Sequence, residues 1–411
     1  RVVVAAYSTY VREPTDLALP AEVAADPKPL DAPGLLSWED ALNAGHEPGR
    51  HTAGPDDLAV IPYSSGTTGQ PKGCMHVHRG PMATAVHRAF WNISNTDSVQ
   101  LCTLPFFHVT GMTGSMNSPI YSGSTMVIMT RWDREVAGKL IERYRVTGWT
   151  NIVTMAVDFL SNPELEKYDI SSLVTIGGGG AAMPEAVAGK LKKLTGLDYV
   201  EGYGLSETMA ATHINPPNNP RAQCLGIPVF DVDSRIIDVE TLEEKGPGEV
   251  GEIVSNGPQV TVGYWNRPAE TEAAFVEIDG KPFFRTGDLA YYDEDGYFYM
   301  VDRVKRMINA SGFKVWPSEV ESMMYQHPAI HEVCIISTPH EKRGETVKAV
   351  VVLSPDGAGN TSEEDIIAWC REQMAAYKVP SIVEFVDELP KSPTGKLMWR
   401  ALQDEEWKKQ G

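Results

Sequence analysis

Residues 63–73 read Tyr-Ser-Ser-Gly-Thr-Thr-Gly-Gln-Pro-Lys-Gly and follow a short apolar run at residues 58–62. The glycines of such a loop let backbone N–H groups approach a bound anion, its hydroxyls donate hydrogen bonds, and Lys72 adds positive charge. The spacing is not that of a Walker A loop, because Lys72 is followed by glycine and the G-x-x-x-x-G-K pattern is absent. This composition directly after a strand predicts a polyphosphate-binding loop rather than an ordinary surface turn.

The chain around this loop, from residue 1 to about residue 302, alternates short apolar runs with helical segments. This alternation is typical of parallel strands joined by crossover helices, so we expect an α/β fold. Strands are expected at residues 98–104, 125–130 and 173–176, and helices at residues 133–145 and 184–196. The apolar face of the first helix would carry Val136, Leu140, Ile141 and Tyr144. Residues 13–55 are expected to be an irregular surface connection, and residues 248–264 an antiparallel piece.

The pattern of predicted helices and strands changes after residue 302. Residues 317–386 alternate two helices with three strands, which predicts a compact α+β unit of the size of a small domain. The boundary near Asp302, Arg303 and Lys305 contains no Pro/Gly-rich linker, so a short hinge is expected. We therefore predict a large N-terminal α/β domain over residues 1–302 and a small C-terminal α+β domain over residues 303–411.

Composition excludes several classes of protein. With 42% hydrophobic and 22% charged residues, the chain has the composition of a globular protein. A formal charge of −19 argues against a nucleic-acid partner and against binding to an anionic membrane surface. No apolar run reaches the roughly 18 residues of a transmembrane segment. The first residues do not show the charged–apolar–small pattern of an export signal, so we expect no export. Five cysteines without a C-x-x-C pair argue against a disulfide framework or zinc ribbon and favour the cytoplasm.

Two further motifs carry candidate chemistry. In Gly202-Tyr203-Gly204-Leu205-Ser206-Glu207-Thr208, a tyrosine can lie against a base and a carboxylate can hold a divalent cation beside phosphates. Taken alone, Glu207 is equally well a solvated residue at the start of a helix. In residues 285–289, Asp288 with Arg303 downstream would suit two ribose hydroxyls as acceptor and donor. A salt bridge explains that pair equally well.

The fourth motif is Pro390-Lys391-Ser392-Pro393-Thr394-Gly395-Lys396-Leu397, a loop that presents a lysine and that could by itself be a solvated turn. The four motifs in this order resemble the adenylate-forming superfamily of acyl-CoA synthetases, luciferases and adenylation domains. The resemblance covers essentially the whole chain. It implies a large N-terminal domain of stacked mixed sheets with helices and a small mobile C-terminal domain. Members carry well over a hundred residues before this loop, so we expect the sequence to be N-terminally incomplete.

The resemblance also assigns the nucleotide site, with ATP and CoA as substrates and Mg²⁺ as the metal. The loop around the β- and γ-phosphates would comprise Ser64, Ser65, Gly66, Thr67, Thr68, Gly69 and Lys72. The strip along adenine would comprise Gly179, Gly180, Ala181 and Ala182, with Tyr203 on the other face. In the turn from Gly204 to Thr208, Ser206 would contact the α-phosphate and Glu207 would bind Mg²⁺. Asp288 and Arg303 would take the ribose hydroxyls, and Lys396 would bridge the substrate carboxylate and the α-phosphate.

For the second half-reaction, the resemblance places the hinge at Lys305. It implies that Ser311, Gly312, Phe313 and Lys314 line the CoA channel. Lys314 would contact a CoA phosphate or remain solvated. The acyl pocket would be lined by the segment that contains His108, Val109, Thr110 and Met112. His108 would be a gate near the carboxylate and not a base, because a carboxylate is already ionised at neutral pH.

The acid itself is predicted from this pocket segment. It contains no acidic side chain to hold an α-ammonium group, and its methionines suit an apolar or sulfur-containing chain. We expect a short- to medium-chain aliphatic acid and include the thioether acid 3-(methylthio)propionate; aryl acids remain open. The alternatives to a free-standing CoA ligase are a luciferase-type acyl-adenylate oxidoreductase and an enzyme that loads a carrier protein. A homodimer is the assembly to test.

Overall fold

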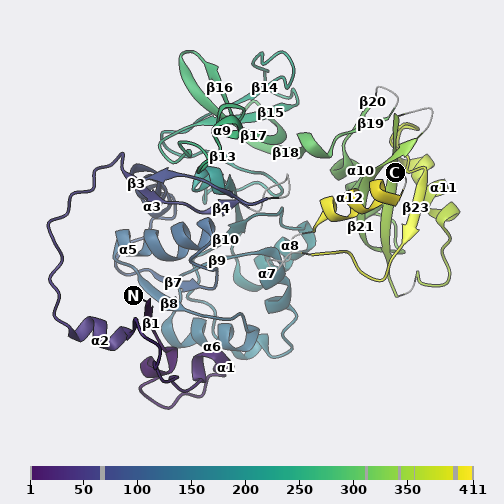
Figure 1. The fold of residues 1–411 in the computed structure, drawn as a ribbon. Coiled ribbons are helices and arrows are strands. Elements are labelled where there is room, and N and C mark those ends of the chain that lie inside the picture. The colour runs from purple at the N-terminus through teal and green to yellow at the C-terminus, as the bar shows by residue number, and fades with distance from the viewer. Residues whose placement is uncertain are drawn as a thin grey trace. The chain divides into compact units, whose positions relative to one another are not determined.

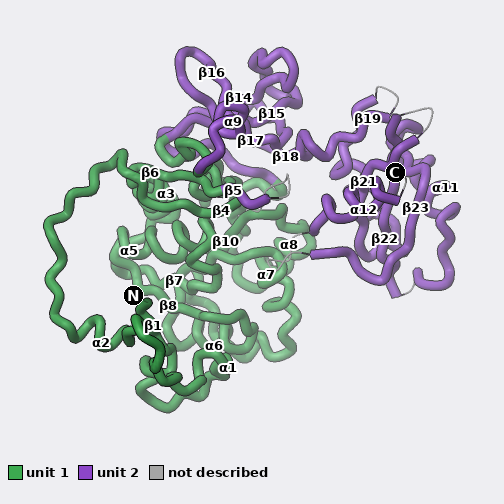
Figure 2. Tube along the Cα trace, in the orientation of Figure 1, with its two compact units in different colours: residues 1–64, 73–223, 258–265 green, residues 65–72, 224–257, 266–411 purple. Residues whose placement is uncertain are grey.

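The computed structural model describes residues 2–64, 70–310, 313–340, 344–355, 357–391 and 397–409. The chain divides into two compact units, which are coloured in Figure 2. The first unit comprises residues 1–64, 73–223 and 258–265, and the second comprises residues 65–72, 224–257 and 266–411. The predicted domain boundary at residue 302 stays a prediction.

The first unit is built on a largely parallel sheet in which β12, β11, β10, β9, β7 and β8 lie side by side in that order. Figure 1 labels four of these strands, β10, β9, β7 and β8. All neighbouring pairs are parallel except β11 and β12. These strands are β7 (Val99–Cys102), β8 (Thr125–Ile128), β9 (Gly148–Asn151), β10 (Thr175–Gly179), β11 (Tyr199–Leu205) and β12 (Ala210–Ile214). The α/β fold expected from the alternating pattern is confirmed.

Three helices supply the core of this unit: α6 (Arg134–Tyr144), α7 (Val153–Leu160) and α8 (Glu185–Thr195). The side chain of Asp133 caps α6 by accepting hydrogen bonds from the amides of Glu135 and Val136, each at 2.9 Å. Gly196 ends α8 in a left-handed conformation with φ 76°. Both predicted helices are therefore confirmed. The core between helices and sheet contains Leu101, Ile141, Trp149, Phe159, Ile176 and Leu191.

Two details of the predicted fold are wrong. Tyr144, expected on the buried face of α6, is 49% exposed, because it is the last residue of the helix and lies beyond the buried residues, which end at Ile141. The expected irregular connection contains regular structure, namely α1 (Ala21–Ala24), β2 (Leu35–Ser37) and α2 (Trp38–Asn43). β2 pairs in parallel with β1 (Val2–Val4), and the Ser37 hydroxyl caps α2 by accepting from the Asp40 amide at 2.9 Å.

Apart from one helix of 13 residues, the remaining elements of the first unit are short. They are η1 (Tyr7–Tyr10), β3 (Leu58–Val60), β4 (Tyr63–Ser64), β6 (His76–Val77), α3 (Arg79–Trp91), α4 (Val109–Gly111), the π-helical turn η2 (Met112–Asn117), α5 (Ser118–Ser122), η3 (Leu165–Lys167) and η4 (Ser206–Thr208). β3 pairs antiparallel with β6. Along the chain, β4 and β5 (Lys72–Gly73) flank the phosphate loop, of which residues 65–69 lie outside the described residues.

The second unit holds two sheets. The first runs β14 (Asp233–Ile237), β15 (Gly251–Asn256), β17 (Lys281–Tyr292), β16 (Phe275–Ile278), with β18 (Phe298–Arg303) also paired to β17. The second runs β20 (Phe313–Val315), β19 (Ile308–Ala310), β22 (Gly344–Leu353), β21 (Ile330–His340), with β23 (Ile382–Phe385) parallel to β22. The other elements are β13 (Ile227–Pro228), α9 (Pro268–Glu272), η5 (Val304–Arg306), α10 (Pro317–Met324), α11 (Glu363–Gln373) and α12 (Trp399–Lys409).

The α+β arrangement expected for the C-terminal part is confirmed. β21 and β22 extend beyond the strands predicted at residues 332–337 and 347–353, whereas β23 ends one residue before the predicted end at residue 386. The buried faces of these strands form a core with α10 and α11. Helix α11 begins with a capping box in which the Ser362 hydroxyl accepts from the Asp365 amide at 3.2 Å and Asp365 accepts from the Ser362 amide at 3.0 Å. The last helix, α12, is held to the sheet by an ion pair of 2.6 Å between the buried Lys348 and Glu406.

Candidate active site

The predicted adenine strip lies at the carboxyl end of β10, beside β11. Gly179 pairs with Gly202, and a Cβ at Gly179 would lie only 2.3 Å from the Gly202 carbonyl oxygen. A Cβ at Gly178 would lie 2.0 Å from the Asn151 carbonyl oxygen. Glycine is therefore required here by the close approach of the strands. Gly180 turns out of the strand with φ 87°, and Ala181 and Ala182 follow it at the surface.

A buried carboxylate fixes the chain that follows this strip. Glu201 accepts hydrogen bonds from the amides of Met183 at 3.0 Å and Gln223 at 2.8 Å. Burial raises the pKa of Glu201, and these two bonds oppose that shift. Glu201 was not among the predicted site residues, although an acid directly before the glycine–tyrosine turn is a signal that the sequence contains.

Tyr203 lies on β11 with its ring beside that of His213, at a centroid separation of 5.7 Å. His213 is fully buried on β12, and burial lowers its pKa to about 3. Its Nδ1 lies 3.0 Å from the Thr212 hydroxyl. The ring of the predicted adenine-stacking tyrosine thus lies next to a buried imidazole, tilted from it by 57°.

The burial of His213 predicts a specific pH dependence of stability. Its pKa in the fold, about 3, is below the ordinary value of 6.5, so unfolding takes up a proton between these values. Its contribution to the free energy of unfolding is fully present above pH 6.5 and is lost as the pH falls towards 3. We expect the melting temperature of the wild type to drop more between pH 7.5 and pH 5 than that of His213→Gln. Equal drops would contradict this assignment.

The turn that carries Glu207 is held in an unusual backbone conformation. A Cβ at Gly204 would lie 1.7 Å from the Ala210 carbonyl oxygen, so only glycine fits. The Thr208 hydroxyl accepts from the Leu205 amide at 2.8 Å and donates to the Ala210 carbonyl at 2.7 Å. Met209 and Ala210 have φ values of 48° and 77°, which cost free energy in residues other than glycine. Thr208 therefore shapes the turn.

Contacts from distant parts of the sequence fix the same turn. The Ser206 carbonyl lies 2.8 Å from Nε2 of His76, which is buried. The Glu207 carbonyl accepts from the Thr261 amide at 2.7 Å, and its Oε1 accepts from the Tyr264 hydroxyl at 3.0 Å. The Glu207 side chain is only partly buried. A partly solvated carboxylate with one oriented oxygen suits Mg²⁺, which is usually bound by one or two carboxylates together with substrate phosphates and waters.

Cys74, His76 and His78 alternate in sequence and could have been taken for metal ligands; packing is the interpretation we favour. Cys74 and His76 are buried, whereas His78 is exposed before α3. Within the described residues, no group of three or more histidine, cysteine, aspartate or glutamate side chains is arranged to hold a metal ion. None of the five cysteines, all buried, forms a disulfide.

The second unit brings together the two residues predicted to hold ribose. Asp288 on β17 and Arg303 on β18 are cross-strand partners, with Nε of Arg303 2.9 Å from Oδ1 of Asp288. Asp288 is buried, so its carboxylate is held in place by the surrounding sheet and has almost no contact with solvent. The preceding turn is anchored by Glu252, which accepts from the Gly287 amide at 3.0 Å and pairs with Arg285 at 2.6 Å. Glu252 was not among the predicted residues.

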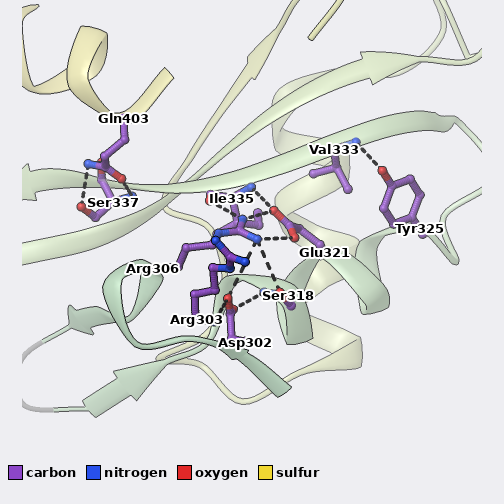
Figure 3. Close-up of polar contacts among 10 residues, drawn as sticks. All are labelled: Asp302, Arg303, Arg306, Ser318, Glu321, Tyr325, Val333, Ile335, Ser337 and Gln403. Carbon is purple, nitrogen blue, oxygen red and sulfur yellow. Dashed lines mark hydrogen bonds and ion pairs between the residues drawn. The ribbon is translucent and has the colours of Figure 1, made fainter. Parts of the chain in front are cut away.

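The predicted hinge carries a network of charged groups (Figure 3). The Asp302 carboxylate accepts from the Ser318 amide at the start of α10 at 2.7 Å. Arg306 pairs with Glu321 and donates to the Ile335 carbonyl at 3.2 Å, as Figure 3 shows. These contacts connect the end of β18 to the C-terminal sheet.

Lys305 lies among cations. Burial lowers its pKa, and the charges of Lys72, Arg400 and Arg303 lower it further. A group of cationic side chains of this kind creates a locally positive potential on a chain whose formal net charge is −19. The structure thus brings the phosphate-loop lysine and the predicted hinge lysine into electrostatic contact.

The predicted acyl segment forms α4 and the π-helical turn that follows. The exposed His108 caps α4, with Nδ1 accepting from the Thr110 amide at 3.3 Å. Val109 is buried, whereas Thr110 and Met112 are partly exposed. A Cβ at Gly111 would lie 2.1 Å from the Pro105 carbonyl oxygen, so this segment is tightly folded on itself. π-Helical turns occur frequently at functional sites.

Several predicted site residues lie outside the described residues: Ser65, Gly66, Thr67, Thr68, Gly69, Ser311, Gly312 and Lys396. Their neighbours are described. Ala310 pairs with Phe313, and Lys391 forms a bridge with Leu397. Phe313 stacks on Tyr377 at 4.9 Å, and Lys314 lies 3.4 Å from Glu240.

Comparison with known proteins identifies the family. Residues 4–265 match the AMP-binding enzyme family, and residues 319–396 match the AMP-binding enzyme C-terminal domain. The chain belongs to the AMP-binding enzymes, as the resemblance of its motifs to adenylate-forming enzymes predicts. It is 42% identical to a long-chain-fatty-acid–CoA ligase of Bacillus subtilis over 85% of this chain and 62% of that protein. It is 33% identical to a 4-coumarate–CoA ligase of Pinus taeda over 85% of this chain and 65% of that protein.

Solved structures agree. ATP-bound MatB from Rhodopseudomonas palustris is similar with a TM-score of 0.82 and 30% identity, over 90% of this chain and 74% of that one. An o-succinylbenzoate–CoA synthetase from Bacillus subtilis, in complex with ATP and magnesium ion, has a TM-score of 0.77 and 27% identity, over 90% and 75% of the two chains. The chain spans about three fifths of the length of the Bacillus subtilis ligase, at 62%. No helix among the described residues is both long and apolar enough to cross a bilayer.

Proposed function

We propose that this protein is an AMP-forming carboxylic acid–CoA ligase. It activates an acid with ATP to an acyl-adenylate, releases pyrophosphate, and transfers the acyl group to CoA. The observation that carries the proposal is the hydrogen-bonded turn at Glu207. It follows Tyr203 at the carboxyl end of β11, next to the glycine strip at the carboxyl end of β10. Ligands of open α/β sheets bind at the carboxyl ends of the strands, where this turn lies.

The described residues would divide the nucleotide between them. Tyr203 and the strip from Gly179 to Ala182 would hold adenine, and Asp288 with Arg303 would hold the ribose hydroxyls. Ser64, Ser206 and Lys72 would contact phosphate oxygens, and Glu207 would hold Mg²⁺. The bound metal would neutralise phosphate charge and so favour attack by an anion.

The chemical step requires attack of one anion on another. The acid is ionised at neutral pH, so no general base is needed, and the rate depends on cancelling the repulsion between its carboxylate and the α-phosphate. We assign that task to Lys396. The carboxylate oxygen forms a bond to the α-phosphorus, the bond to the bridging oxygen of pyrophosphate breaks, and the electron pair leaves with pyrophosphate. The CoA thiol then loses its proton and its sulfur bonds to the acyl carbon, while the bond from that carbon to the AMP oxygen breaks and AMP leaves with the electron pair.

The acid is the least constrained part. Several relatives are long-chain-fatty-acid–CoA ligases, and others carry the names of aryl acids. The partly exposed Thr110 and Met112 beside an exposed His108 suit an apolar chain. Our preference remains a short- to medium-chain aliphatic acid, with 3-(methylthio)propionate included. We place the reaction in the cytoplasm, and a homodimer stays a prediction.

A panel of acids tests the proposal. The protein is incubated with ATP, Mg²⁺, CoA and each of acetate, butyrate, octanoate, palmitate, 3-(methylthio)propionate and 4-coumarate, and AMP and acyl-CoA are measured by mass spectrometry. We expect AMP and one acyl-CoA in equal amounts for the preferred acid. Light emission with O₂ and a luciferin would favour the luciferase-type alternative. Acylation of a carrier protein but not of CoA would favour the carrier-loading alternative.

The CoA step makes a separate prediction at Gly312. Glycine permits close backbone approach to a pantetheine chain, and a large side chain would obstruct the thiol. We expect Gly312→Leu to form acyl-adenylate at the wild-type rate but to transfer it to CoA about 100-fold more slowly. Rapid-quench measurement of the two steps checks this. Gly189→Leu is the control, at an exposed position in α8 with nothing within 4 Å of its Cβ and without a positive φ. Equal loss in both steps would refute the assignment.

A further inference from the structure

The segment at residues 261–264 contacts the turn that carries Glu207, and the proposed function gives this segment no role. It runs beside the residues that leave the phosphate loop. The Met75 amide donates to the Gly263 carbonyl at 2.9 Å, and the Val262 amide donates to the Met75 carbonyl at 3.0 Å. Cys74 and Tyr264 form a backbone bridge between the two segments. The segment is thus fixed to the chain that carries the phosphate loop.

The same segment holds Glu207 at two points. The Thr261 amide binds the Glu207 carbonyl at 2.7 Å, and the Tyr264 hydroxyl donates to Oε1 of the Glu207 carboxylate at 3.0 Å. The Thr261 hydroxyl also donates to the Met75 carbonyl at 2.9 Å. Hydrogen bonds therefore connect Met75, the segment at residues 261–264 and Glu207 into one framework within the first unit.

The contact between Tyr264 and Glu207 involves one particular oxygen of the carboxylate, Oε1. Tyr264 is only 7% exposed, so its ring is fixed by packing and its hydroxyl has little freedom. An ionised carboxylate only accepts hydrogen bonds, so the phenol must be the donor. Donation to one carboxylate oxygen fixes the rotation of the group and so the direction of its lone pairs. Partners of this kind behind a metal ligand typically contribute a factor of about 10–100 in metal affinity.

We propose that Tyr264 is a positioning residue for the Glu207 carboxylate and sets the affinity of the site for Mg²⁺ bound with nucleotide. This inference rests on the proposed function, because it takes Glu207 as the Mg²⁺ ligand. Tyr264 itself does not touch metal or nucleotide. Its removal weakens the metal-dependent part of nucleotide binding and leaves the metal-independent part unchanged.

Calorimetric titration with the unreactive analogue α,β-methylene-ATP tests this without turnover. Each protein is titrated in the presence of Mg²⁺ and in the presence of EDTA, and the ratio of the two affinities is the metal-dependent gain. We expect Tyr264→Phe to reduce this gain about 10-fold and to leave the affinity in EDTA unchanged. Tyr292→Phe is the matched control, because it removes a hydroxyl that donates to the Lys245 carbonyl at 3.3 Å in the other unit.

A double-mutant cycle separates positioning from a purely structural role. In a Glu207→Gln background, Tyr264→Phe should change the gain by less than about 2-fold, because the carboxylate that it orients is absent. An unchanged gain in the single variant overturns the inference, and so does an equal loss of affinity in EDTA. If the wild type fails to bind the analogue under both conditions, the proposed function falls and this inference with it. Binding by the wild type with no effect of Tyr264→Phe overturns the inference alone.

Discussion

Replacing Lys396 with alanine is expected to slow formation of the acyl-adenylate by about 10²–10³-fold. The reason is that the attacking carboxylate and the α-phosphate repel each other, and the positive charge that we assign to Lys396 would offset that repulsion. Thioester formation from supplied acyl-adenylate should change far less, because the CoA sulfur then attacks the acyl carbon and not the negatively charged α-phosphate. Single-turnover measurement of pyrophosphate release and of acyl-CoA formation checks both steps.

The loop offers a matched control for this experiment. Lys391 lies near Lys396 in the sequence and forms an ion pair of 2.5 Å with Glu332, which is on β21. Lys391→Ala therefore removes a lysine that has a partner within the protein and no proposed role in the reaction. We expect it to affect both half-reactions less than about 3-fold, in line with the small contribution of exposed ion pairs. If Lys396→Ala lowered both steps equally, the assignment of Lys396 to the first half-reaction would be wrong.

Gly204→Ala is expected to reduce adenylate formation by about 100-fold, because displacement of a substrate-positioning group by about 1 Å has effects of this size. The added Cβ would lie 1.7 Å from the Ala210 carbonyl oxygen, which belongs to the backbone and cannot turn away like a side chain. The turn must therefore open, and Glu207 moves with it. Initial rates of pyrophosphate release at saturating ATP measure the loss, and circular dichroism confirms that the variant is folded.

Gly189→Ala is the control for Gly204→Ala. Gly189 lies in α8 with nothing within 4 Å of its Cβ. Alanine in a helix is favoured over glycine by roughly 0.5–1 kcal/mol, so this variant should melt at the same or a higher temperature with unchanged activity. A Gly204→Ala protein with wild-type pyrophosphate release would show that the geometry of this turn is not needed for the chemistry.

The sequence alone predicted features that depend on local physical chemistry. The boundaries of α8 follow from Pro184 and Gly196, and the cap of α6 follows from Asp133. The α/β class follows from the alternation of apolar runs and helices. The Asp288–Arg303 pair was also predicted as a pair, although the sequence could not distinguish a ribose site from a salt bridge. The structure shows the salt bridge, and the ribose assignment remains a proposal.

The residues that the sequence analysis missed act over long separations in the chain. Tyr264 is 57 residues from Glu207 and His76 is 130 residues from Ser206, so no local pattern indicates either contact. Glu252 binds the Gly287 amide from a neighbouring strand, and that depends on strand register. The prediction of irregular structure at residues 13–55 missed β2 for the same reason. This strand forms by pairing with β1, and its own sequence shows no strand pattern. Motifs predicted the groups that would touch substrate, whereas the groups that orient them required the fold.

The central claim is that ATP is cleaved between its α- and β-phosphates by a carboxylate. Acid-dependent exchange of ³²P-labelled pyrophosphate into ATP, measured with CoA withheld, tests it most directly. The account predicts rapid exchange with the preferred acid and none without it, because the adenylate forms reversibly before any thiol is needed. Formation of ADP and orthophosphate with that acid, and no exchange of pyrophosphate, would contradict it.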